Sequence, residues 1–340
     1  MLYLDGSHGE GGGQILRTAL SLAALKEQQV RIQGIRAGRL KPGLRPQHLT
    51  AVQALAQITR AEVAGAELHS QELTFRPGPT RGGHYFFDVA AKTGSAGSVS
   101  LIAQALLPAL LKAGQPSTLI LKGGTHVPFS PPAHYLLAVF LPALARMGDV
   151  VKMTLNRWGW YPRGGGETRW EITPAPSLCG VEWLSPPPAG AFRALSAASR
   201  VPEHVSRRQA LRLKERLGED LPVEVIEATA SDPGSLVFLW GPQAGFSALG
   251  ARGKPAEKVA DEAADAFFSF RQSRGAVDRH LADQLMLYLA QARGPSTLIT
   301  EEITSHLLTN LWVIEQFLGP TFQVKGGLGE PGEITCRGGK

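Results

Sequence analysis

The chain has 340 residues, of which 43% are hydrophobic and 19% charged. This excludes a disordered tail and indicates two or more packing units. The formal charge of +6 favours polyanionic partners such as nucleic acid or nucleotide phosphates, although no long Lys/Arg block occurs. Cys179 and Cys336 are too far apart to suggest a disulfide framework or a metal site, and no apolar run reaches membrane-spanning length. We therefore expect a reduced cytoplasmic protein with no membrane segment.

Strand and helix patterns alternate along the chain. The first part predicts strands and two interleaved helices, beginning with a short buried strand, at residues 1–5, 15–23, 30–35, 47–58, 72–77 and 85–89. A similar series follows at residues 98–113, 117–123, 132–147, 151–156 and 167–173. The last series lies at residues 282–292, 297–300 and 306–317. The pattern predicts an α/β (α+β) fold in which three repeated α/β units form a large domain.

The third unit is interrupted by a block with its own strands and helices. A proline-rich linker at residues 185–190 precedes it. The block predicts strands and helices at residues 192–199, 204–217, 223–230, 235–240 and 257–271. We expect a catalytic domain at residues 1–184 and 277–340, with a smaller α/β domain at 185–276 inserted before the third unit. The charged helix face at residues 207–216 is expected to be solvated surface.

The first motif that could carry chemistry is a glycine-rich turn, Gly9 to Gly13, between a strand and a helix. Consecutive glycines let backbone amides approach an anion, and the helix N-terminus adds partial positive charge. The spacing is neither that of a P-loop nor that of a dinucleotide fingerprint. Glu10 would repel a phosphate unless a metal ion lay between them. A plain tight turn and a phosphate site are equally compatible with the spacing.

Two further loops follow strands, where sites are commonly built. Residues 35–48 hold the cations Arg36, Arg39, Lys41 and Arg45 in a loop stiffened by glycine and proline. Because arginine binds phosphate oxygens bidentately, this loop suits a nucleic-acid end group, although an exposed basic loop is the alternative. Residues 123–132 combine three prolines with an aromatic residue into a rigid rim that could stack on a base. Taken alone, that segment is better explained as a structural turn between a strand and a helix.

His306 stands at the predicted start of a helix. A neutral imidazole is nucleophilic and can form a phosphoramidate, and its ordinary pKa of about 6.5 keeps much of it neutral near pH 7. A helix N-terminus further disfavours the imidazolium. Most histidines are not catalytic, so a non-catalytic role is the better interpretation of this residue taken alone.

Five motifs together resemble the RNA 3′-terminal phosphate cyclase family. They are EGGGQILR, IRAGRLKPGLRPQHL, GSAGS at residues 94–98, HLADQL at residues 280–285 and SHLLTN. The resemblance runs in order from Asp5 to about Phe317. It implies three α/β repeats with a small inserted domain, which agrees with the predicted elements.

The resemblance implies a three-step reaction that uses ATP and a divalent metal, Mg²⁺ or Mn²⁺. The histidine would attack the α-phosphorus of ATP, forming a covalent histidine–AMP. AMP would then pass to an RNA 3′-phosphate, giving an RNA(3′)pp(5′)A end. The neighbouring 2′-hydroxyl would finally expel AMP and close a 2′,3′-cyclic phosphate. The partner is thus an RNA with a 3′-phosphate end, and the family implies no obligate protein partner.

The resemblance also implies roles for particular residues. The catalytic residues would be His306, Arg17 and Arg36. Glu10 would be the metal-associated carboxylate. Phosphate and RNA would be bound by Gln14, Arg39, Gln47, Gly11, Gly12 and Gly13. The nucleotide pocket would be formed by Gln104, Pro131, His280, Leu281, Ala282, Asp283 and Gln284. His280 stands where the family usually has an aromatic residue stacked on adenine, and Asp283 would either orient His306 or bind ribose.

Three other functions are compatible with parts of the sequence. A catalytically inactive cyclase-like factor in ribosome assembly would lack the nucleophile, so the presence of His306 with Glu10, Arg17 and Arg36 opposes it. An enolpyruvyl-transferase-like enzyme would use related α/β units on a small phosphorylated substrate. A passive RNA-binding module is suggested by charge alone, and the sequence has no RNP-type aromatic signature.

Overall fold

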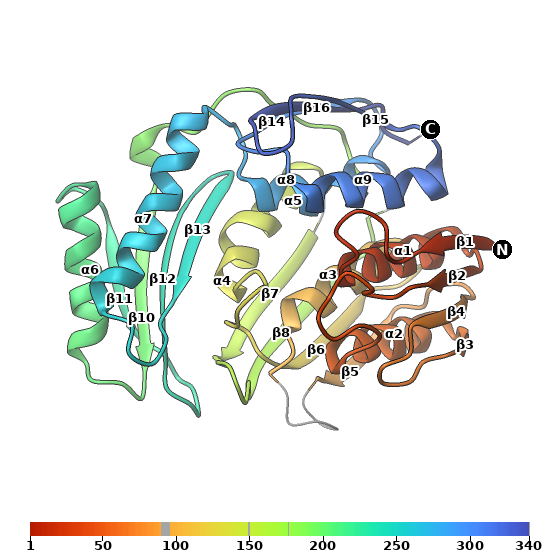
Figure 1. Ribbon diagram of the computed structural model, residues 1–340, viewed down its shortest axis with the longest axis horizontal. Helices are drawn as coiled ribbons and strands as arrows, with labels where there is room; N and C mark the ends of the chain where they lie inside the picture. Colours follow the sequence, from red (N-terminus) through yellow and green to blue (C-terminus); the bar gives the residue numbers. More distant parts are fainter. Residues whose placement is uncertain (90–95, 149, 176, 340) are drawn as a thin grey trace.

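The computed structural model describes residues 1–89, 96–148, 150–175 and 177–339. Gly94 and Ser95, which begin the GSAGS motif, lie outside the described residues. Three small sheets with their helices form the larger part of the molecule, and a fourth sheet with two helices stands beside them, at the left of Figure 1. Among the described helices, none combines the length and the apolar character that crossing a membrane requires.

The three sheets of the larger part have the same topology. In spatial order, the first sheet contains β1 (Leu2–Asp5), β2 (Val30–Gln33), β4 (Glu72–Arg76) and β3 (Glu62–Ala64). The second contains β5 (Gly83–Asp88), β6 (Ser117–Gly123), β8 (Gly166–Thr173) and β7 (Val150–Arg157). The third contains β9 (Glu182–Trp183), β14 (Ser296–Thr300), β16 (Gly332–Cys336) and β15 (Phe322–Lys325). In each, the first pair is parallel and the other two pairs are antiparallel. The predicted threefold repetition is therefore confirmed.

Each unit contributes helices to a shared interior. They are α1 (Gly13–Lys26) and α2 (Pro46–Thr59), then α3 (Val99–Leu111), α4 (Ala133–Tyr135), the π-helix η1 (Leu136–Phe140) and α5 (Leu141–Arg146), and finally α8 (Arg279–Leu289) and α9 (Ser305–Leu318). Helix α1 contacts α2, α3 and α9, so the three units share one hydrophobic core. α3 is apolar around most of its circumference because it is buried on nearly all sides.

Some predicted elements differ from the structure in ways that have physical causes. The helix predicted at residues 132–147 contains a π-helical turn, a feature that apolar periodicity does not reveal. Strand β1 was expected to be buried, but it lies at the edge of its sheet and Tyr3 is exposed. An edge strand has a neighbouring strand on one side only. A pattern of four residues cannot indicate whether a strand lies at the edge or in the middle of its sheet.

The fourth sheet belongs to the inserted block. Its strands, in spatial order, are β11 (Val223–Glu227), β10 (Arg193–Ser199), β12 (Gly234–Gly241) and β13 (Ala244–Leu249). A short 3-10 turn, η2 (Ala189–Ala191), precedes it, and α6 (His204–Leu217) and α7 (Ala256–Ser273) pack on the sheet and on each other. A separate apolar cluster that includes Phe192, Leu213 and Phe270 lies inside. We call this block the inserted unit. The domain limits at residues 184–185 and 276–277 stay a prediction.

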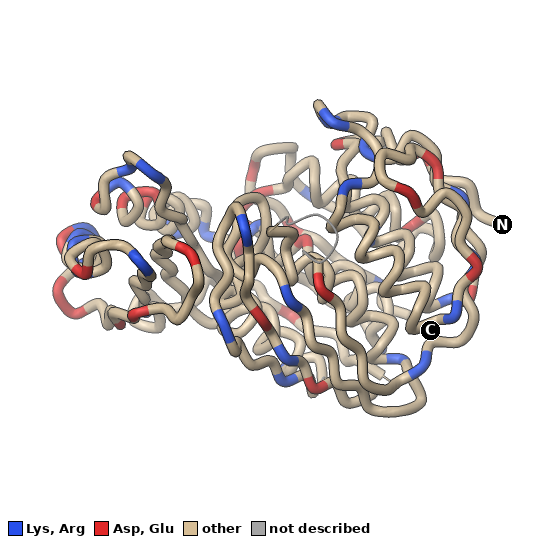
Figure 2. The backbone as a smooth tube through the Cα atoms, turned by 90° about the horizontal axis from the view of Figure 1, so that it is seen from below, with Lys and Arg blue, Asp and Glu red and all other residues tan. Residues whose placement is uncertain are grey.

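The charged face of α6 is not simply solvated. Ion pairs join it to α7, with Arg208 to Glu257, Arg212 to Asp261, and Arg216 to Asp261 and Asp265. Figure 2 shows acidic and basic residues interleaved along the inserted unit and over the rest of the molecule. Such exposed pairs contribute little to stability, but they fix how the two helices lie against each other.

Candidate active site

A cavity of about 760 Å³ lies where the three units and the inserted unit meet. Its walls come from α1, α3, the segment 129–132, strand β13 and the first turns of α8 and α9. The structure brings nine of the predicted site residues to this cavity. They are Glu10, Gln14, Arg17, Gln104, Pro131, His280, Asp283, Gln284 and His306.

His306 is the second residue of α9, close to the predicted helix start. Thr304 caps this helix, and its hydroxyl accepts a hydrogen bond from the Leu307 backbone N–H at 3.0 Å. The Nδ1 atom of His306 lies 3.0 Å from Oδ2 of the buried Asp283. Burial opposes the charged imidazole, but the charge and hydrogen bond of Asp283 outweigh it, so the pKa of His306 is raised. The expected effect of the helix N-terminus is therefore overridden by the carboxylate.

Asp283 is held in place by amide side chains. Its Oδ1 accepts hydrogen bonds from Nε2 of Gln14 at 2.8 Å and from Nδ2 of Asn310 at 3.1 Å. The Oδ1 of Asn310 in turn accepts from the hydroxyl of Thr18 at 2.8 Å. Burial disfavours the Asp283 carboxylate, yet His306 and Gln14 together keep its pKa below the ordinary value. Asp283 therefore orients His306, which was one of its two predicted roles.

Helical spacing decides which residues of the segment 280–284 reach the cavity. His280, Asp283, Gln284 and Leu287 line the cavity wall, following the i, i+3, i+4, i+7 stripe of one helix face. Leu281 and Ala282 are on the opposite face, and their side chains are fully buried in the core. These two side chains therefore lie outside the cavity wall, and the assignment of Leu281 and Ala282 to the nucleotide pocket stays a prediction.

The glycine turn leads directly into α1. Gly11 has a φ of 55°, and a side chain there would meet the backbone of Gly38 at 3.0 Å. At Gly13, a Cβ atom would lie 2.3 Å from Nε2 of His48. The Glu10 backbone N–H donates to the Thr309 hydroxyl at 3.2 Å, which joins the turn to the helix carrying the nucleophile candidate. The turn is thus packed against both the basic loop and α9.

Cations gather beside this turn. Burial lowers the pKa of Arg17 to about 10, and the nearby Arg36 adds to the lowering while Asp283 and Glu10 oppose it. Burial, with Arg45 and Arg39, also lowers the pKa of Arg36. Like charges are unfavourable when close together, so this arrangement is suited to an anion that would neutralise them.

His48 belongs to the same cluster and was not predicted as a site residue. Burial and the charges of Arg17, Arg36 and Arg45 hold its pKa well below the ordinary value, so the ring is neutral. Its Nδ1 accepts a hydrogen bond from the Arg45 backbone N–H at 3.4 Å, which leaves the proton on Nε2, facing Gly13. Arg39, Lys41 and Arg45 all precede His48 by fewer than ten residues, and this was the sequence signal that could have identified the histidine.

Several predicted residues lie beside the cavity and not in its described wall. They are Arg36, Arg39, Gln47, Gly11, Gly12 and Gly13. The Arg36 guanidinium donates to the backbone carbonyls of Lys41 at 2.7 Å and Gly43 at 2.9 Å, and Arg39 pairs with Glu10. Gln47 accepts a hydrogen bond from the Ser98 backbone N–H at 3.2 Å. In this arrangement each of these side chains shapes the loops around the cavity.

Three buried amide atoms have no hydrogen-bond partner within the part of the chain that the structure describes. They are Oε1 of Gln14, Nε2 of Gln104 and Oε1 of Gln284, and all three residues line the cavity. Buried polar atoms are nearly always hydrogen-bonded in folded proteins. The three atoms are enclosed by protein, so these amide groups must turn before the unpaired atoms can reach a ligand in the cavity.

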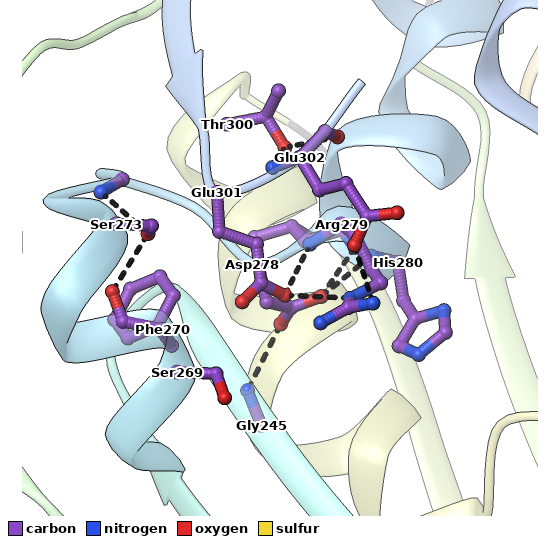
Figure 3. A network of polar contacts seen from close by, with 12 residues as sticks. Gly245, Ser269, Phe270, Ser273, Asp278, Arg279, His280, Thr300, Glu301 and Glu302 are labelled. Carbon is purple, nitrogen blue, oxygen red and sulfur yellow. Dashed lines mark hydrogen bonds and ion pairs between the residues drawn. The ribbon is translucent and has the colours of Figure 1, made fainter. Parts of the chain in front are cut away.

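A buried carboxylate that the sequence did not single out connects the cavity wall to the inserted unit. Asp278 caps α8 by accepting from the backbone N–H groups of His280 at 2.7 Å and Leu281 at 2.8 Å. It also accepts from the Gly245 N–H of β13 and from the Tyr135 hydroxyl, all at 2.9 Å. Figure 3 shows the contacts of this carboxylate with Gly245 and with the start of α8, and the imidazole of His280 directed away from them. Burial raises the pKa of Asp278 to about 6.

The comparisons with known proteins agree with this geometry. A family model described as RNA 3′-terminal phosphate cyclase matches residues 8–324. A protein named RNA 3′-terminal phosphate cyclase from Thermococcus onnurineus is 45% identical, over 99% of this chain and 99% of its own length. A protein of the same name from Methylococcus capsulatus is 47% identical, over 93% of this chain and 91% of its own length. An EPSP synthase structure from Acinetobacter baumannii covers 95% of this chain and 62% of its own, but its TM-score of 0.29 and 13% identity are too low to support an argument. As the five motifs predict, the chain belongs to the RNA 3′-terminal phosphate cyclase family of enzymes.

Proposed function

We propose that this enzyme uses ATP to convert the 3′-phosphate end of an RNA into a 2′,3′-cyclic phosphate through a covalent histidine–AMP. The observation that carries the proposal is the His306–Asp283 pair in the cavity wall. The carboxylate accepts the Nδ1–H of the imidazole, which leaves the lone pair of the neutral ring on Nε2. That nitrogen is the one available to attack phosphorus.

The proposed reaction has three displacements. Nε2 of His306 bonds to the α-phosphorus of ATP, and pyrophosphate leaves. An oxygen of the RNA 3′-phosphate then attacks the same phosphorus, and the P–N bond breaks to restore the neutral imidazole. Finally, the RNA 2′-oxygen attacks the 3′-phosphorus and expels AMP, and the proton of the 2′-hydroxyl is released to solvent. Each step needs in-line placement and neutralisation of phosphate charge more than acid–base chemistry.

The cations supply that neutralisation at one end of the cavity. Arg17 lines the cavity, and the Arg39 guanidinium lies against Gly12 of the glycine turn. Arg36 is outside the cavity wall, and its charge acts on Arg17. The neutral His48 and the N-terminus of α1 add uncharged donors. This group fits the RNA 3′-phosphate and the pyrophosphate portion of ATP.

A divalent ion fits this end if most of its ligands come from substrate. Among the residues that the structure describes, no three His, Cys, Asp or Glu side chains gather closely enough to hold a metal ion. Mg²⁺ in nucleotide sites is commonly held by one or two carboxylates together with phosphate oxygens and water. Glu10, which lines the cavity, is the carboxylate for Mg²⁺ or Mn²⁺. When bound, the ion would neutralise phosphate charge.

The other end of the cavity suits the nucleoside. Gln104 and Gln284 line the cavity, and an amide group can recognise a base edge or a ribose hydroxyl. His280 is exposed, and its ring meets Tyr135 edge-on at 6.4 Å. It can therefore present one face to adenine, with Pro131 in the same cavity wall. The predicted nucleotide contacts of Gln104, Gln284, His280 and Pro131 are thus part of the proposal.

The decisive experiment is incubation of the full chain with α-labelled ATP and Mg²⁺ or Mn²⁺. Wild type is expected to retain label that is stable to alkali and labile to acid, as a phosphoramidate is. His306→Ala is expected to retain none while keeping the wild-type circular dichroism spectrum. The control His84→Ala changes an exposed histidine of β5 and should label normally. Equal labelling of His306→Ala and wild type would refute the assignment.

A further inference from the structure

The segment 127–131 holds an aromatic side chain in an unusual state. Phe129 is fully exposed to solvent, and its backbone φ is 61°. A bulky side chain in the left-handed region is a true outlier, because its Cβ crowds the neighbouring carbonyl oxygen. Exposing a whole phenyl ring also forgoes the free energy of burying it. The unfavourable backbone angle and the exposed ring both occur at a residue that lines the cavity containing His306.

The segment is held rigidly on both sides. The Ser130 hydroxyl donates to the Val127 carbonyl at 3.1 Å, and the Ala133 backbone N–H donates to the Thr125 carbonyl at 2.8 Å. The Thr125 N–H donates to the Gly159 carbonyl at 3.0 Å. Prolines at positions 128, 131 and 132 fix further backbone angles. The ring is therefore presented in a defined place and is not the tip of a loose loop.

The geometry points to Phe129 as a stacking platform for the terminal nucleobase of the RNA substrate, an inference that rests on the proposed cyclase function. An RNA chain cannot enter the cavity whole, so its 3′-phosphate must reach His306 while the attached nucleotide stays at the entrance. An exposed ring on the cavity wall is positioned for that nucleotide. Stacking on an aromatic face accepts every base, which suits an enzyme that acts on an end group.

The alternative source of a planar base is the adenine of ATP. Pro131, Gln104 and Gln284, together with His280, already provide a stacking surface and polar groups for a nucleoside in the same cavity wall. Phe129 has no comparable buried polar neighbours in the described segment 127–131, since Pro128 is exposed and Ser130 bonds its own loop. The ring therefore fits a base that arrives from solvent better than one that is enclosed.

The test compares two RNAs that both end in a 3′-phosphate and differ only in the terminal nucleotide, which carries a base in one and is abasic in the other. Cyclisation is measured as kcat/KM for wild type, Phe129→Ala, Phe129→Tyr and the control Leu211→Ala, which removes an exposed apolar side chain of α6. Wild type is expected to lose about 5- to 100-fold on the abasic RNA, the range of one base–aromatic stack. For Phe129→Ala, kcat/KM on the RNA with a terminal base should fall by the same factor relative to wild type. On the abasic RNA, kcat/KM of Phe129→Ala should equal that of wild type. Phe129→Tyr and Leu211→Ala should behave as wild type.

Self-labelling with α-labelled ATP separates the possible failures. Phe129→Ala is expected to keep the wild-type labelling rate and KM for ATP. If its KM for ATP rises while RNA use is unchanged, the assignment to the RNA base is overturned. Equal losses on both RNAs would also overturn it. A wild-type chain that neither labels nor cyclises would instead refute the proposed function itself.

Discussion

Replacing Asp278 with alanine tests whether one buried carboxylate fastens the inserted unit to the cavity wall. The carboxylate caps α8 and accepts hydrogen bonds from β13 and from Tyr135. Its removal leaves those donors unpaired in the interior. The variant is therefore expected to lose stability beyond the loss of a helix cap.

The magnitude follows from opposing effects. Loss of an N-cap costs about 0.5–2 kcal/mol, and each buried donor left without an acceptor costs about 1–3 kcal/mol. Against this, burial has raised the pKa of Asp278 from 3.8 to about 6. Each pKa unit corresponds to about 1.4 kcal/mol, so keeping the group ionised at pH 7 costs roughly 3 kcal/mol. The free energy of unfolding of Asp278→Ala should therefore fall by about 2 kcal/mol at pH 7.

The pH dependence has a definite sign. Between pH 3.8 and about 6 the folded chain holds a proton on Asp278 that the unfolded chain has lost. The protonated Asp278 therefore contributes its full stabilisation to the free energy of unfolding below this pH range, and that stabilisation falls as the pH rises through the range. The deficit of Asp278→Ala relative to wild type should therefore be larger at pH 5 than at pH 7.5.

Urea unfolding followed by circular dichroism at those two pH values measures the deficit. Ser98→Ala is a matched control, because Ser98 caps α3 through one hydrogen bond from the Leu101 N–H at 3.3 Å. It should show the cost of a cap alone. A stability of Asp278→Ala equal to that of wild type at both pH values, or a deficit that grows with pH, would refute the reasoning.

Two further substitutions probe the proposed chemistry. In Asp283→Asn the new amide oxygen can still accept the hydrogen bond from Gln14, with the amide nitrogen facing His306. The imidazole would then carry its proton on Nε2, so self-labelling should fall by about two to four orders of magnitude. A variant in which only the pH profile of labelling shifts would contradict this. Gly13→Ala places a Cβ atom 2.3 Å from Nε2 of His48 and should displace that ring; KM for the RNA 3′-phosphate should rise, whereas wild-type kinetics would show that the close approach is unimportant.

The sequence predicted the features that depend on neighbours along the chain. Helical spacing placed His306 near a helix start and put Asp283 and Gln284 on one helix. It left His280 outside that helix, which was predicted from residue 282 but begins at Arg279. Family motifs placed Leu281 and Ala282 in the same pocket, because a contiguous match does not indicate which face of a helix points inward. Helical periodicity applied to the same residues would have separated the two faces.

Features that depend on distant residues were not predictable from these patterns. Tyr135 and Asp278 are 143 residues apart, and neither belongs to a recognisable motif. Arg36 and Arg39 were expected at the phosphate, but their placement relative to the cavity depends on how the loop folds back on itself and on Glu10. The role of Asp283 as the partner of His306 likewise required α8 and α9 to be set against each other.

The parallel pairing of β9 with β14 has a consequence for biosynthesis. Glu182 pairs with Thr297, so this ladder closes a gap of more than a hundred residues. During translation, the short β9 segment must wait without its neighbour until the whole inserted unit has been made. His306 follows later still, so a ribosome-bound chain has its glycine turn and basic loop long before the His306–Asp283 pair can form. Assembly of the third sheet is therefore expected to be the slow folding event, because closing long-range contacts is entropically costly.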